Sequence, residues 1–142
     1  KVKPGDKLTE GSVNPKELNS IFEDINKISE KLKELFSQLP ENVDILFSHD
    51  APYGVSDVCF QGWSADGQHK GCPELRDAIL EKKPRYCFHG HLHSSNHGEE
   101  LLGETKVYNT SILDEEYKIV YEPLIIRICK TEELPSPLEV LN

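Results

Sequence analysis

Methionine is absent from the 142 residues of this chain, and the chain contains no extended basic run. Its 16 lysine and arginine residues are outnumbered by 25 acidic ones, so the formal net charge at pH 7 is -9. Binding of a nucleic-acid backbone through a positive surface is therefore disfavoured, because it needs clustered basic side chains. An acidic surface also repels anionic substrates unless bound cations offset its charge locally.

Signals for membranes and disulfides are missing as well. No apolar stretch approaches the roughly 18 residues of a transmembrane helix, and no signal peptide is visible. The four cysteines are widely spaced and form no Cys-x-x-Cys pattern, so a disulfide framework is not indicated. We therefore expect a cytoplasmic protein with reduced thiols and no membrane partner.

A long amphipathic helix is predicted near the start of the chain. Asn14 is a candidate N-cap, Pro15 occupies the first helical position, and Pro40 ends the pattern after residue 39. Apolar residues recur with helical period over residues 18–39, which predicts a packing helix with one buried face.

The remaining predicted elements are short. In chain order they are a strand, a helix and five more strands, at residues 43–47, 73–82, 85–88, 100–102, 105–108, 117–121 and 124–128. The first of these strands is almost entirely apolar, which predicts burial on both of its faces. The order of strand, helix and strand predicts a parallel pair.

Histidines follow both strands of this predicted pair. His49 comes after the first strand, and Gly90-His91-Leu92-His93 comes after the second. Functional loops in such sheets lie beyond the carboxyl ends of the strands, which predicts one shared site. Imidazole is a common ligand for zinc, manganese and iron, and Gly90 is expected to permit the bend that directs both rings to one side.

Other residues near these motifs have less specific interpretations. His89 is expected to belong to the strand end and His97 to face solvent, so that the cluster as a whole is also compatible with a polar surface loop. His69 lies in a glycine-rich loop without a recognisable partner. Asp50 is expected either to orient the ring of His49 or to cap the next turn.

Two motifs in order resemble those of the calcineurin-like metallophosphoesterases. Residues 44–52 resemble the family's strand-then-histidine motif, and Gly90-His91-Leu92-His93 resembles its closing Gly-His-x-His motif. Residues 71–75 and 108–111 also fit the family pattern. The resemblance covers residues 44–128, well over half of the chain, and is greatest to the small phosphodiesterase branch that includes the animal metallophosphoesterase-domain proteins.

This resemblance implies an α/β fold in which the chain forms the C-terminal half of a four-layer α/β/β/α sandwich. It implies two divalent metal ions, drawn from Mn, Fe, Zn, Mg or Ni, at the carboxyl ends of strands. By motif position, His49 and His91 are the implied ligands of the second metal and His93 of the first. The resemblance assigns no catalytic or substrate-binding residue in this chain.

The family's first three motifs, Asp-x-His, Gly-Asp-x-x-Asp and Gly-Asn-His-Asp/Glu, are absent. Three imidazoles alone do not offset the repulsion between two bridged cations. We therefore expect residues 1–142 to be the C-terminal part of one domain, with a loop and packing helix at 1–42 and the motifs at 43–142. The expected partner is a missing N-terminal half, on the same or a separate chain, which agrees with a start at Lys1 rather than methionine.

The predicted function is a metal-dependent phosphoesterase that hydrolyses a phosphodiester or phosphomonoester small molecule and is inactive as this fragment alone. Tyr53, Trp63 and His69 lie on loops that can shape a substrate pocket, although aromatic loop residues more often only pack. The alternatives are a non-catalytic, phosphoesterase-like binding or scaffold domain and an unrelated structural domain with surface histidines.

Overall fold

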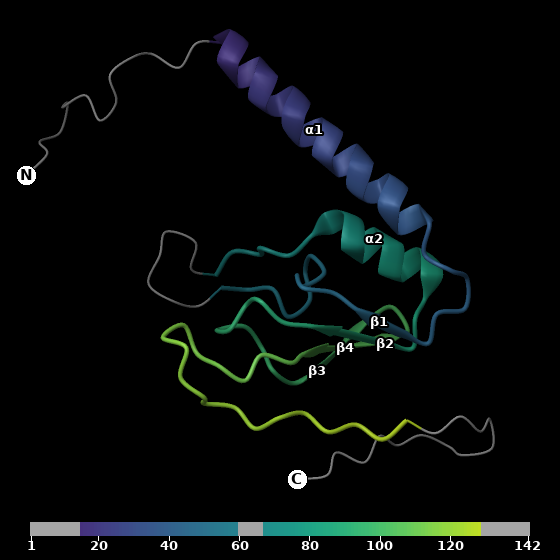
Figure 1. Cartoon of the computed structure of the whole chain (residues 1–142), viewed down its shortest axis with the longest axis vertical. Helices are drawn as coiled ribbons and strands as arrows, with labels where there is room; N and C mark the ends of the chain where they lie inside the picture. The colour runs from purple at the N-terminus through teal and green to yellow at the C-terminus, as the bar shows by residue number, and fades with distance from the viewer. Residues whose placement is uncertain (1–14, 60–66, 129–142) are drawn as a thin grey trace, which may run out of the picture.

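The computed structural model describes residues 15–59 and 67–128, which form a mixed α/β arrangement (Figure 1). One sheet of four strands is present in this part, in the order β1-β2-β4-β3. The elements are α1 (Pro15–Ser37), β1 (Ile45–Phe47), α2 (Pro73–Lys82), β2 (Tyr86–His89), β3 (Glu99–Leu102) and β4 (Thr105–Asn109). The predicted α/β class is confirmed, and one four-stranded mixed sheet of the predicted fold is described.

Three of the four strands run in the same direction. β1 pairs with β2 and β2 pairs with β4 in parallel, whereas β3 is antiparallel to β4. The predicted parallel pair is therefore confirmed. Because β1, β2 and β4 end at the same edge, the loops that follow them gather at one end of the sheet, on the left in Figure 1.

Helix α2 begins and ends where the sequence predicts. Pro73 opens it, the Cys72 sulfur accepts from the amide of Leu75, and Lys83 closes it in the left-handed conformation by donating to Ile79. The buried face of α2 lies against one face of the sheet. This core comprises Leu75, Ile79, Cys87, Leu102 and Val107.

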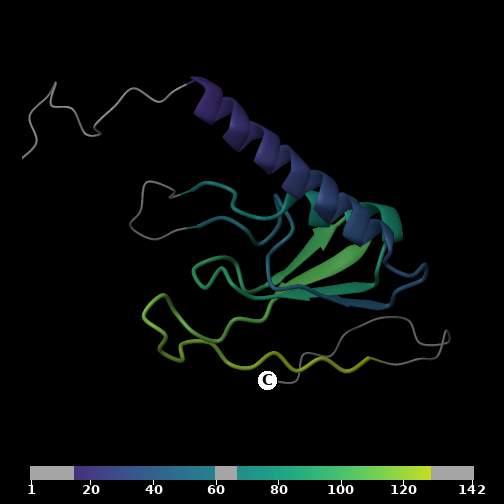
Figure 2. The ribbon, with the colours of Figure 1, turned by 45° about the horizontal axis from the view of Figure 1, so that its top comes forward.

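The opposite face of the sheet carries stacked aromatic rings. The ring centroids of Phe88 and Tyr108 lie 5.5 Å apart, and Tyr86 continues the row. Leu124, Ile126 and Ile128 pack on these rings, so residues 121–128 cross beneath the sheet (Figure 2).

The predicted strands at 117–121 and 124–128 are wrong. Only isolated bridges, such as Leu113 with Ile119, occur in this stretch of the described chain. Alternating apolar residues place 124–128 against the face of the sheet rather than at its edge, where a ladder of hydrogen bonds can form. A period of two in the apolar residues indicates an extended chain with one buried side. A β-strand also needs a neighbouring strand with which its backbone forms hydrogen bonds.

The apolar stripe of α1 is largely exposed, contrary to the expectation of a helix packed on its own sheet. The exposed members are Ile21, Phe22, Ile25, Ile28 and Leu35. Near its end, Phe36 packs against the core beneath α2, and farther up Ser29 donates a hydrogen bond to Glu74 of α2. The rest of the helix extends past the sheet (Figures 1 and 2). The predicted N-cap, Asn14, lies outside the described residues.

Two further findings concern exposure. β1 is an edge strand of the described sheet, and Phe47 is 75% exposed, so the prediction of burial on both faces of this strand is wrong. No described helix is both long enough and apolar enough to cross a membrane.

Candidate metal centre

Hydrogen bonds beyond the ends of β1 and β2 hold His49 beside the Gly-His-x-His motif. The amide of Ser48 donates to the Phe88 carbonyl at 3.0 Å, and the amide of Gly90 donates to the His49 carbonyl at 3.2 Å. The pairing of the two strands thus continues for two steps into the loops. His49 and His91 consequently leave the sheet as neighbours.

The backbone turns sharply at His91. This residue has a φ of 65°, and the amide of Leu92 donates to the Gly90 carbonyl at 2.8 Å, which closes a three-residue turn around His91. The prediction that Gly90 supplies the bend is wrong, because the left-handed residue is His91 itself. A non-glycine residue held in this region costs about 1 kcal/mol or more, and such strain concentrates at functional sites.

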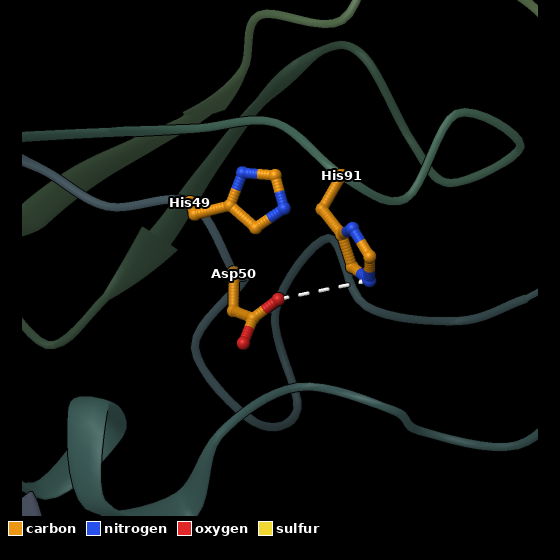
Figure 3. A group of neighbouring side chains, drawn as sticks. All are labelled: His49, Asp50 and His91. Carbon is orange, nitrogen blue, oxygen red and sulfur yellow. Dashed lines mark ion pairs between the residues drawn. The ribbon is translucent and has the colours of Figure 1, made fainter.

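The turn brings three potential ligand groups together. The ring centroids of His49 and His91 lie 4.7 Å apart, and Asp50 Oδ1 lies 3.7 Å from His91 Nε2. One ligand atom from each of the three residues lies within 4.8 Å of the others, and all three side chains are exposed (Figure 3). The sequence predicts the two histidines as ligands, whereas it offers Asp50 only as an orienting or capping residue.

Two imidazoles and one carboxylate are a donor set suited to zinc, manganese or iron. Ligand atoms at about 2.2 Å from one ion lie at most about 4.4 Å from each other, so small side-chain rotations would bring these groups to bonding distance. The arrangement therefore fits a divalent cation in both chemistry and spacing.

His93 lies in the same loop but outside this group of three. Its Nδ1 donates to the Asp114 carbonyl at 2.8 Å, and the Tyr117 ring meets it edge-on at 5.7 Å. A hydrogen bond from one ring nitrogen to a carbonyl is the usual support of a metal-binding histidine, because it leaves the other nitrogen with its lone pair. His93 Nε2 thus retains its lone pair.

The Asp114 side chain stabilises the segment that supports His93. Its Oδ1 accepts from the amides of Lys118 and Glu116 at 2.9 and 2.8 Å. The hydrogen bond from Lys118 is the main cause of the lowered pKa of this carboxyl group. An ionised Asp114 therefore holds the turn whose carbonyl fixes the His93 ring.

The two other histidines of this region lie outside the group of three. His89 is the last residue of β2, as predicted, and burial lowers the pKa of its imidazole. His97 Nε2 donates to the His93 carbonyl at 2.8 Å, and its ring stacks on Tyr121. The expectation that His97 simply faces solvent is therefore incomplete, because the residue supports the loop that carries His93.

Sequence reasoning missed a buried partner of His69. Its Nδ1 lies 2.6 Å from Oδ1 of Asp57, whose side chain is fully buried, and its ring lies against Tyr53. The two residues are twelve positions apart on opposite sides of a loop, so no helical or strand spacing signals the contact. Trp63, which the sequence offered as a pocket residue, lies outside the described residues.

Comparisons with known proteins bear on this site. No family model matches the chain. A UPF0046 protein of Caenorhabditis elegans is 34% identical over 101 residues, which cover 70% of this chain and 35% of that protein. Metallophosphoesterase domain-containing protein 1 of Homo sapiens is 32% identical over 108 residues, covering 75% of this chain and 29% of that protein. The chain belongs to the calcineurin-like metallophosphoesterase family.

A third metallophosphoesterase relative is the lariat debranching enzyme of Entamoeba histolytica, which is 30% identical over 95 residues, or 61% of this chain and 26% of that protein. This chain therefore spans about a third or less of the length of the relatives it matches. Its metallophosphoesterase relatives imply the use of divalent metal, and the exposed group of His49, Asp50 and His91 is where the described chain offers ligands for one.

Proposed function

We propose that this chain supplies part of the divalent-metal centre of a phosphoesterase, with His49, His91 and His93 as imidazole ligands. One observation carries the proposal: His49, Asp50 and His91 converge within 4.8 Å at the carboxyl ends of two parallel strands. Family membership supports the reaction class, a hydrolysis of a phosphodiester or phosphomonoester small molecule.

A divalent ion in this position supplies Lewis-acid polarisation of a phosphoryl oxygen and activates a water molecule. The protein's own groups prepare for it. His49 and His91 must be neutral to offer a lone pair, so protonation at acid pH opposes metal binding. Asp50 brings a negative charge that offsets part of the cation's charge, and the Asp114 carbonyl keeps the hydrogen of His93 on Nδ1.

We further propose that two ions, drawn from Mn, Fe, Zn, Mg or Ni, occupy the complete centre. The described residues contain one group of three with ligand spacing, and a bridged pair of cations needs more carboxylate than Asp50 provides. The further ligands would come from an N-terminal half of the same domain, on this chain or a separate one. A reducing, cytoplasmic setting belongs to the same proposal, and the free thiols of Cys59, Cys72 and Cys87 support it.

Metal content and hydrolysis of the full-length protein test this proposal. After dialysis, elemental analysis is expected to find divalent metal in the wild type and a reduced content in His91→Ala, with loss of hydrolysis of bis(p-nitrophenyl) phosphate. Asn96→Ala is the matched control, because it removes an exposed side chain from the same loop. Residues 1–142 expressed alone are expected to show no turnover.

Two outcomes would contradict the proposal. Unchanged metal content and turnover in His91→Ala would remove the motif from the centre. A full-length wild type that binds no metal and hydrolyses no phosphate ester would favour the non-catalytic alternative, a phosphoesterase-like scaffold or binding domain.

A further inference from the structure

The pair formed by Asp57 and His69 is not used by the proposed metal centre. Asp57 is fully buried, whereas the side chain of His69 is 44% exposed. A carboxylate oxygen only accepts hydrogen bonds, so the 2.6 Å contact places the hydrogen of the ring on Nδ1. None of the described residues hydrogen-bonds to His69 Nε2. Nδ1 of the half-exposed His69 ring is therefore hydrogen-bonded to Asp57, and Nε2 is available to a ligand.

The carboxylate that holds the ring is itself fixed. The amides of Gly54 and Gly71 each donate to Asp57 Oδ2 at 2.9 Å. Burial opposes ionisation, but the hydrogen bonds from His69 and from these amides outweigh it and lower the pKa of Asp57. A buried, ionised carboxylate orients an imidazole and stabilises its positively charged form, as in catalytic triads. Asp57 therefore acts as a positioning residue for His69.

The segment that carries His69 is joined to the loop that leaves the metal centre. The amide of Cys72 donates to the Ala51 carbonyl at 2.9 Å, one residue beyond Asp50. A Cβ added at Gly71 would lie 2.7 Å from backbone atoms of Pro52 and Tyr53, so the two chains touch directly. This contact fixes the position of the His69 segment relative to Asp50.

The other side of the same hairpin approaches the closing histidine motif. His69 forms a β-bridge with Val58, and the next residue, Cys59, places its sulfur 3.9 Å from the hydroxyl oxygen of Ser94. Ser94 directly follows His93. The segments that flank this loop therefore contact both of the loops that carry the candidate ligands.

A second cationic group lies against this loop. Arg76 Nη1 is 3.6 Å from the position that a Cβ at Gly54 would occupy, and the arginine is half-buried. No described carboxylate forms an ion pair with this guanidinium. In a chain with a net charge of -9, an arginine without an acidic partner is notable because its planar donor fork matches phosphate oxygens.

We propose that His69, positioned by Asp57 and assisted by Arg76, is a phosphate-contacting subsite that binds the anionic group of the substrate next to the metal centre. When the His69 ring carries a hydrogen on both nitrogens, it donates from Nε2 to a phosphate oxygen while Asp57 holds Nδ1–H. The guanidinium of Arg76 beside Gly54 adds positive charge. This inference rests on the proposed phosphoesterase function for its substrate class. A purely structural role explains the buried Asp57 but not an oriented, outward nitrogen on His69.

Titration of the metal-free full-length protein with inorganic phosphate tests the subsite without catalysis. In protein labelled with nitrogen-15 at histidine, the ring signals of His69 are expected to shift on addition of phosphate. His69→Ala is expected to weaken phosphate binding, followed at the Gly54 amide, roughly tenfold, as for loss of one charged hydrogen bond. Lys70→Ala, which removes a neighbouring exposed charge, is the control and is expected to bind as the wild type does. Ring signals that do not respond to phosphate would overturn the proposal.

Steady-state hydrolysis of bis(p-nitrophenyl) phosphate by the metal-loaded protein supplies the second readout. His69→Ala is expected to raise KM about tenfold and leave kcat within about twofold, and His69→Gln, which retains an N–H donor, is expected to recover part of the loss. A lowered kcat with unchanged KM would overturn the anion-contacting role. If the wild type shows no turnover, the phosphoesterase function fails, and the phosphate titration still decides whether the subsite exists.

Discussion

Two carboxylate–imidazole pairs in this molecule consist of the same chemical groups and have opposite surroundings. Asp57 and His69 lie 2.6 Å apart, with the carboxylate fully buried and hydrogen-bonded to two amides. Asp50 and His91 lie 3.7 Å apart, with side chains 57% and 54% exposed. The first carboxylate has its acceptor capacity used within the protein, whereas the second retains most of it.

The difference in burial distinguishes a carboxylate that stabilises the fold from one that is able to bind a cation. A buried carboxylate with three donors contributes to the fold and gains little from a cation, because its partners would have to be displaced. An exposed carboxylate beside two imidazoles has unused lone pairs at a common point, which is what a cation requires. Sequence composition does not distinguish the two pairs, and burial does.

The largest expected effect is the loss of metal binding in His49→Ala or His91→Ala. Removing a direct ligand is expected to lower metal affinity about 100-fold or more, since even supporting residues contribute 10- to 100-fold. His69→Ala, from the buried pair, is expected to leave the metal affinity unchanged. Calorimetric titration of the full-length variants measures both values, and equal losses in the two pairs would remove the distinction between them.

Replacement of the two carboxylates is expected to affect stability in the reverse order. Asp57→Ala leaves the amides of Gly54 and Gly71 without their acceptor and is expected to lower the free energy of unfolding by about 3 kcal/mol. Asp50→Ala removes an exposed group and is expected to change it by less than about 0.5 kcal/mol. Urea denaturation decides this, and a larger loss in Asp50→Ala would show that the exposed pair supports the fold.

His91→Gly is expected to separate stability from function at a single position. Glycine adopts a positive φ without steric cost, so the variant is expected to gain about 1 kcal/mol in the free energy of unfolding while it loses the ligand. His91→Ala also loses the ring but keeps a Cβ at the positive φ, so it relieves no strain and serves as the control. A destabilised His91→Gly protein would mean that contacts of the ring outweigh the backbone strain.

The smallest expected effect is on the pH dependence of the free energy of unfolding. The pKa of Asp57 is lowered below its ordinary value of 3.8 in the folded chain, so its contribution to stability is fully present above that value. The contribution is lost as the pH falls from that value through the folded pKa, because the unfolded chain then binds a proton that the native Asp57 resists. Unfolding curves from about pH 5 to about pH 2 are expected to fall more steeply for the wild type than for Asp57→Ala. An equal pH dependence of stability in the wild type and in Asp57→Ala would contradict the lowered pKa of Asp57.

Local patterns in the sequence were sufficient for the elements that carry the site. Pro73 and the stripe of Leu75, Ala78 and Ile79 located α2 correctly, and the order of elements predicted the parallel pairing that brings His49 to His91. These features depend on helix capping, on periodicity and on the handedness of crossover connections, all of which are readable from neighbouring residues.

The features that were missed depend on contacts that no local pattern encodes. The stripe of α1 specifies an apolar face but no partner, and Phe22 and Ile28 remain exposed in the described chain. The contact of Asp57 with His69 crosses a loop, and the left-handed conformation of His91 is imposed by the pairing of Gly90 with His49. Each is a tertiary effect that overrides the preference of the residue concerned.

The absence of a side chain at Gly71 also limits how relatives of this protein can diverge. Any larger residue there would overlap the backbone of Pro52 and Tyr53. Only glycine therefore fits at position 71 while this loop keeps its conformation. The exposed neighbours His69 and Lys70 are under no such restriction. The residues beside the glycine can therefore vary while the loop that presents Asp50 keeps its position.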